Sequence, residues 1–72
     1  MPTEASYNLF LDKKNKWMAE NPGWYVVIKN GKLCGMYHSA LDTEANAPKY
    51  GDDLLIIHLD PQGAKEYRLK NK

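Results

Sequence analysis

The segment from Asn21 to His38 constrains the fold of this chain more than any other part of the sequence. Two runs of strand-forming residues are separated there by Asn30-Gly31, a dipeptide that favours the type I′ turn of a two-residue β-hairpin loop. Such a turn also sets the pairing of the two strands. The predicted pairs are Lys29 with Lys32, Ile28 with Leu33, Val27 with Cys34, Val26 with Gly35, Tyr25 with Met36 and Trp24 with Tyr37.

Both faces of this predicted hairpin are apolar. Because side chains alternate along a strand, one face is expected to carry Trp24, Val26, Ile28, Leu33 and Tyr37. The other is expected to carry Tyr25, Val27, Cys34 and Met36. A ribbon that is apolar on both sides must be covered on both sides, by helices of its own chain or by another molecule.

A helix is predicted before the hairpin. Its apolar residues recur at helical spacing from Tyr7 to Met18. Ser6 or Asn8 is expected to cap its start, which makes residues 1–6 a frayed lead-in. Asn21-Pro22-Gly23 ends the helix, because the residue before a proline is disfavoured in the α conformation.

A shorter helix is predicted after the hairpin. Ser39 or Asp42 can accept hydrogen bonds from its first amides, and Gly51 is suited to its end. Pro48 limits this helix to about two turns, and a loop with one helical turn is the alternative. The side chains expected to point inward are Leu41, Ala45 and Tyr50.

A second hairpin is predicted at the end of the chain. The apolar run Leu54–Leu59 has the character of a central strand, and Asp60-Pro61-Gln62-Gly63 follows it as a turn. With a loop of residues 61–63, the expected pairs are His58 with Glu66, Ile57 with Tyr67 and Leu55 with Leu69. The whole chain, residues 1–72, is therefore predicted to be one α+β domain with an antiparallel sheet and a frayed end at residues 70–72.

These residues resemble small prokaryotic domains of unknown function. The resemblance is seen in three segments: Asn-Pro-Gly-Trp to Leu-Cys-Gly, Thr43-Glu44-Ala45 and Lys49-Tyr50-Gly51-Asp52. Those domains have a helix, a Gly-Trp-x-Val hairpin, a short helix and a strand. A second such family, with a two-strand, helix, two-strand plan, is similar to the tail from Leu-Ile-Ile-His to Lys-Glu-Tyr-Arg. Pro48 departs from both patterns, and neither resemblance implies an activity.

Composition limits the classes of function. A chain of 72 residues with a net charge of +1 lacks the strongly basic balance of a general nucleic-acid binder. A single cysteine excludes an intramolecular disulfide and favours a reducing compartment. The start of the sequence lacks the features of a signal peptide, and no apolar run has the length of a membrane span. A cytoplasmic location is therefore expected.

The sequence contains few residue patterns that indicate catalysis. Cys34 and His38 share one strand, where four residues correspond to roughly 13 Å, which is beyond the reach of a nucleophile and its base. Phosphate-binding glycine loops, nucleophile elbows and metal-ligand spacings are absent from the sequence. We therefore expect a protein without catalytic activity, cofactor or metal.

Two binding functions remain. The favoured one is a protein-interaction module with Tyr25, Val27, Cys34 and Met36 as the interface, either self-associating as a homodimer or serving as an accessory or phage-type factor. The alternative is nucleic-acid binding, in which Tyr25 or Tyr37 stacks on bases. The phosphate contacts would then come from Lys29, Lys32, Lys65 and Arg68.

Overall fold

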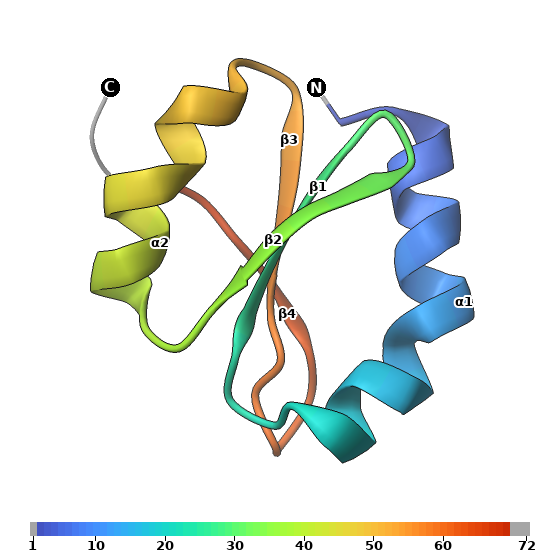
Figure 1. Cartoon of the computed structure of the whole chain (residues 1–72). Helices are drawn as coiled ribbons and strands as arrows, with labels where there is room; N and C mark the ends of the chain where they lie inside the picture. Colours follow the sequence, from blue (N-terminus) through green and yellow to red (C-terminus); the bar gives the residue numbers. More distant parts are fainter. Residues whose placement is uncertain (1, 70–72) are drawn as a thin grey trace.

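The computed structural model describes residues 2–69 and contains a four-stranded antiparallel sheet between two helical layers (Figure 1). The elements are α1 (Glu4–Glu20), β1 (Tyr25–Lys29), β2 (Lys32–Tyr37), α2 (Ala40–Asn46), the 3₁₀ helix η1 (Ala47–Tyr50), β3 (Leu54–His58) and β4 (Lys65–Tyr67). The strand order in the sheet is β2-β1-β3-β4. The predicted α+β order and the antiparallel sheet are confirmed.

Each face of the sheet has its own core. Figure 1 shows α1 on one side of the sheet and α2 on the other. The core beneath α1 consists of Trp17, Val26, Ile28, Leu55, Ile57 and Leu59. The core beneath α2 and η1 consists of Val27, Ala47 and Ile56. The chain therefore covers both apolar faces of its central strands with its own helices.

Helix α1 begins earlier than predicted. Thr3 is its N-cap and accepts a hydrogen bond from the Ser6 N–H at 3.3 Å. Glu4 stands in the first turn, where a carboxylate is favoured by the helix dipole. The prediction of a frayed lead-in over residues 1–6 is therefore wrong for residues 4–6, and the expected caps at Ser6 and Asn8 are wrong as well. Residues 70–72 lie outside the described residues.

Ser6 joins the start of α1 to the first hairpin. Its side chain is fully buried, and its Oγ accepts a hydrogen bond from the Gly31 N–H at 3.0 Å. A Cβ at Gly31 would lie 2.9 Å from the Cβ of Ala5, so only glycine allows this close approach. Asn30 and Gly31 both have positive φ, 52° and 79°, as the predicted turn requires.

The register of the first hairpin is only partly as predicted. Lys29 and Ile28 pair with the expected residues, but a bulge follows, and Val27 lies opposite Gly35 instead of Cys34. The bulge adds one residue to β2. The pairs after it are therefore Val26 with Met36 and Tyr25 with Tyr37. Met36 consequently packs on the α1 side of the sheet, whereas Tyr37 packs on the α2 side.

The second hairpin is shifted by one residue from its predicted register. The Gly63 N–H donates to the Asp60 carbonyl at 2.8 Å, which closes a loop of two residues, 61 and 62, rather than three. The observed pairs are Ile56 with Tyr67, Ile57 with Glu66 and His58 with Lys65. The predicted pairing of His58 with Glu66 is therefore wrong. Tyr67 and Leu69 pack beneath α2, on the face opposite to the predicted one.

Helix α2 is short and uses small residues to cover the sheet. Ser39 caps it by accepting from the Asp42 N–H at 3.1 Å, which was one of the two predicted caps. Its inward side chain is Thr43, and the following 3₁₀ helix η1 adds Ala47; both are fully buried. The expected inward position of Leu41 is wrong, because 80% of that residue is exposed. Ala45 is exposed as well, and Tyr50 is half-buried.

We predict that Ser6→Ala lowers the free energy of unfolding by about 1–3 kcal/mol, because the change removes the acceptor of the Gly31 N–H. Urea unfolding followed by circular dichroism measures the change. Asn8→Ala, at an exposed position of the same helix, is the control and should be nearly neutral. Equal stability of the Ser6→Ala variant and the wild type would contradict the role of this hydrogen bond.

Candidate functional site

The four predicted interface residues do not form one exposed surface. Val27 is fully buried beneath α2 and η1, and Met36 lies on the opposite face of the sheet. Tyr25 is half-buried and stacks on His58 with the ring centroids 4.3 Å apart. Cys34 is half-buried and packs against the core that contains Val27. A docking surface on this face would therefore require the removal of α2.

Polar contacts from tyrosines help to fasten α2 and η1 to the sheet. The hydroxyls of Tyr37 and Tyr50 lie 2.9 Å apart, and the Tyr67 hydroxyl donates to the Glu44 carboxylate. The Lys29 ammonium donates to the Tyr50 carbonyl at 2.8 Å. Sequence reasoning missed these contacts because each joins residues at least 13 positions apart.

The same contacts change the acidity of two phenols. The hydrogen bond with Tyr50, together with burial, raises the pKa of Tyr37 from 10.0 to about 12. The hydrogen bond to Glu44, followed by burial and the charge of that carboxylate, raises the pKa of Tyr67 to about 12 as well. Both phenols are therefore neutral donors or acceptors at physiological pH.

The cysteine and the two histidines each have different neighbours. The Cys34 Sγ lies 3.9 Å from the Lys32 carbonyl oxygen. The rings of His38 and His58 pack instead against Trp24 and Tyr25. Across residues 2–69, no group of three or more His, Cys, Asp or Glu side chains is arranged to hold a metal ion. The described residues thus offer no assembled nucleophile and base.

The four basic residues considered for nucleic acid are spread over the sheet. Lys29 and Lys32 pair beside the first turn, while Lys65 pairs with His58 at the other end of the central strands. The Lys29 ammonium is already bound to the Tyr50 carbonyl. Arg68 follows β4 and lines a separate groove. These positions do not converge on one phosphate-binding surface.

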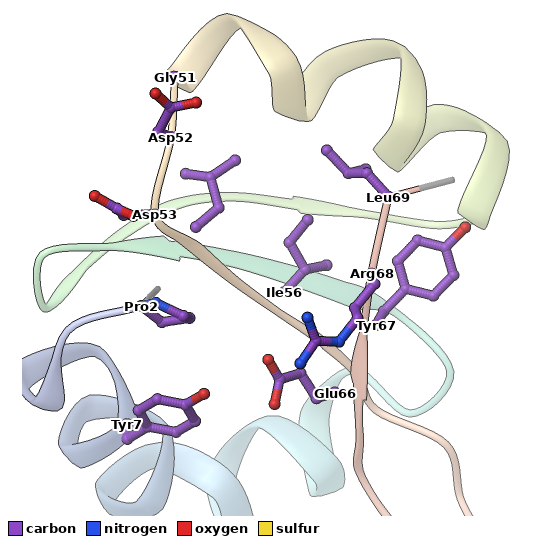
Figure 2. Close-up of a pocket in the computed structure, with 11 residues that line it drawn as sticks. Pro2, Tyr7, Gly51, Asp52, Asp53, Ile56, Glu66, Tyr67, Arg68 and Leu69 are labelled. Carbon is purple, nitrogen blue, oxygen red and sulfur yellow. The ribbon is translucent and has the colours of Figure 1, made fainter. Parts of the chain in front are cut away.

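That groove, of about 540 Å³, lies where β4 separates from β3 (Figure 2). β4 pairs with β3 only from Ile56 to His58, so the start of β3 borders the opening. Figure 2 shows Glu66 and Arg68 on the side of Tyr7, and Tyr67 on the other side. The remaining lining residues are Pro2, Gly51, Asp52, Asp53, Leu54, Ile56 and Leu69. Charges of both signs are mixed along its wall.

The outer edge of β2 is the candidate interaction site. Within residues 2–69 the sheet has two edges, β2 and β4. β4 has only three residues, and two of them are the charged Lys65 and Glu66. β2 has six residues, of which Lys32 alone is charged. Short, charged edges resist pairing with other strands, whereas longer apolar edges favour it.

Two apolar residues of β2, Leu33 and Met36, are partly exposed. Leu33 is 46% exposed, although it is paired with the fully buried Ile28. Met36 lies three residues further along β2, is half-buried and packs against the core beneath α1. Figure 1 shows β2 in front of the sheet, with no other segment of the described chain across it. One side of the β2 backbone therefore has no strand partner within residues 2–69.

Comparisons with protein-family models, with curated proteins and with solved structures find no match to this chain. None of the helices in residues 2–69 combines the length and the apolar character needed to cross a membrane.

We predict that two of the five tyrosines titrate near pH 12 in the folded protein, whereas all five titrate near pH 10 in urea. Because the folded-state pKa values lie above the unfolded ones, the protonated phenols of Tyr37 and Tyr67 stabilise the folded state. This contribution to the free energy of unfolding is complete below pH 10 and is lost as the pH rises through about 12. The ultraviolet absorbance of tyrosinate and urea unfolding at each pH measure both effects.

The test uses Tyr37→Phe and Tyr67→Phe, each of which should remove one late-titrating group. Tyr7→Phe is the control, because Tyr7 is exposed and its loss should leave both late groups in place. Titration of all five tyrosines near pH 10 in the folded wild type would show that the hydroxyl contacts do not form.

Proposed function

We propose that this chain is a small, non-catalytic protein-interaction module inside the cell, which binds by adding a strand to the outer edge of β2. The observation that carries the proposal is the six-residue length of this edge and its single charge, at Lys32. Strand addition supplies affinity through main-chain hydrogen bonds and specificity through alternate side chains. An intracellular location rests on the single cysteine.

Burial of both sheet faces supports an edge rather than a face as the contact. Val27 and Ile56 pack with Ala47 in the core beneath α2 and η1, and Val26 and Ile57 lie in the core beneath α1. A partner that used either face would have to displace a helix. A partner at the β2 edge displaces neither helix and can bury the exposed part of Leu33.

Nucleic-acid binding receives less support from the same residues. Its basic candidates lie at different places, and Lys29 is held by the Tyr50 carbonyl. Binding of that kind would weaken steeply with salt, whereas strand addition at an apolar edge would not. Salt dependence thus separates the two functions.

Selection from a displayed library of random peptides tests the proposed function. We expect enriched peptides rich in β-branched and aromatic residues, because these favour extended pairing. Their binding should depend little on salt and should shift the backbone NMR signals of Lys32–Tyr37. Leu33→Glu should weaken their binding at least about tenfold, because it puts a carboxylate against the added strand.

Leu41→Glu is the matched control. It makes the same substitution at an exposed leucine of α2, outside β2, and should leave peptide binding unchanged. The proposal fails if the selection enriches no peptide. It also fails if the enriched peptides bind the Leu33→Glu variant as well as the wild type.

A further inference from the structure

The order of residues along β2 makes this edge complementary to itself. Its sequence is Lys32-Leu33-Cys34-Gly35-Met36-Tyr37. When two copies are aligned antiparallel about their centre, Lys32 faces Tyr37, Leu33 faces Met36 and Cys34 faces Gly35 of the other copy. The first residue is a cation and the last an aromatic, and the second and fifth are both apolar.

We infer that the partner of the β2 edge is a second copy of this chain, paired antiparallel in this register to extend the sheet across a two-fold axis. The inference rests on the proposed function and names its partner. A two-fold axis uses the same strand on both subunits, so each complementary pair occurs twice.

The structure places the members of each pair on the same face of the sheet. Leu33 is opposite Ile28 and Met36 is opposite Val26, and both Ile28 and Val26 belong to the core beneath α1. The bulge is essential here, because without it Met36 would point to the α2 side. In the proposed dimer, the exposed part of Leu33 is therefore covered by Met36 of the second copy.

The opposite face is complementary as well. Lys32 is paired with Lys29, whose ammonium reaches the Tyr50 carbonyl on the α2 side. Tyr37 also packs on that side. Lys32 would thus lie beside the Tyr37 ring of the second copy, where a cation and an aromatic face attract each other. The two Lys32 residues stand at opposite ends of the paired strands and do not repel each other closely.

Cys34 and Gly35 form the centre of the pairing. Tyr37 already covers Gly35 within one copy, since a Cβ at Gly35 would lie 2.9 Å from the Tyr37 hydroxyl oxygen. A contact limited to one six-residue strand is small, so we expect a weak, concentration-dependent dimer.

Disulfide trapping tests the register. Two variants, Leu33→Cys and Met36→Cys, each also carry Cys34→Ser so that only the introduced thiol can react. They are mixed in equal amounts and oxidised with glutathione disulfide. Directly opposed residues have Cβ atoms about 4.5–5.5 Å apart, close to disulfide geometry. Intact mass spectrometry distinguishes the three possible linked dimers by mass.

We expect the mixed dimer, which joins position 33 to position 36, to exceed clearly the half expected from random pairing. A random distribution, or a predominance of either homodimer, would overturn the register. Sedimentation supplies a second readout that needs no introduced cysteine. The wild type and Leu41→Glu should dimerise as concentration rises, and Leu33→Glu should raise the dissociation constant at least about tenfold.

A wild type that remains monomeric at all concentrations would overturn the inference. In that case, peptides captured at Lys32–Tyr37 would still support strand addition by another protein. Failure of both experiments would reject the proposed function together with its partner.

Discussion

Burial of the two central strands on both faces is the constraint on which the rest of this structure depends. Three consecutive residues in β1, Val26–Ile28, and three in β3, Leu55–Ile57, are all buried. Because neighbouring side chains point to opposite faces, no single layer of helix can cover them. The chain therefore needs helical cover on each side, and its edges become the accessible parts of the sheet.

The two helical layers bury the faces of the sheet with different kinds of residues. α1 brings Trp17 and several partly buried large apolar side chains onto one face. α2 has seven residues and buries only Thr43, so its layer also depends on Ala47 of η1 and on the hydroxyl contacts of Tyr37 and Tyr67. A short helix with small inward residues can thus seal an apolar face when polar contacts help to position it.

The sequence predicted the elements of the fold better than the pairing between them. The Asn30-Gly31 turn and the order of helices and strands follow from local chemistry, which a single sequence shows directly. The register after Val27 does not, because the hairpin is apolar on both faces and a shift of one residue leaves no polar side chain buried. The one local sign of the bulge in β2 was Gly35, because an isolated glycine inside a strand often marks a bulge.

The β2 edge, which is the candidate interaction site, could not be predicted from the sequence for a related reason. A sheet edge is defined by strand order, and nothing in the local pattern showed that β1 and β3 pair and leave β2 outside. The predicted interface also assumed that a truncated helix could not cover Val27, whereas Ala47 and Thr43 allow α2 and η1 to approach closely. Small inward residues indicate close packing, and their spacing of four was the available clue.

Amide hydrogen exchange at several protein concentrations tests most directly whether β2 is the open edge of an otherwise sealed sheet. We expect protection in Lys32–Tyr37 to rise with concentration, while exchange in Lys65–Tyr67 and in α2 stays constant. Exchange in β2 that is independent of concentration would contradict the account. So would a concentration dependence confined to α2, because it would place the contact on the face that α2 covers.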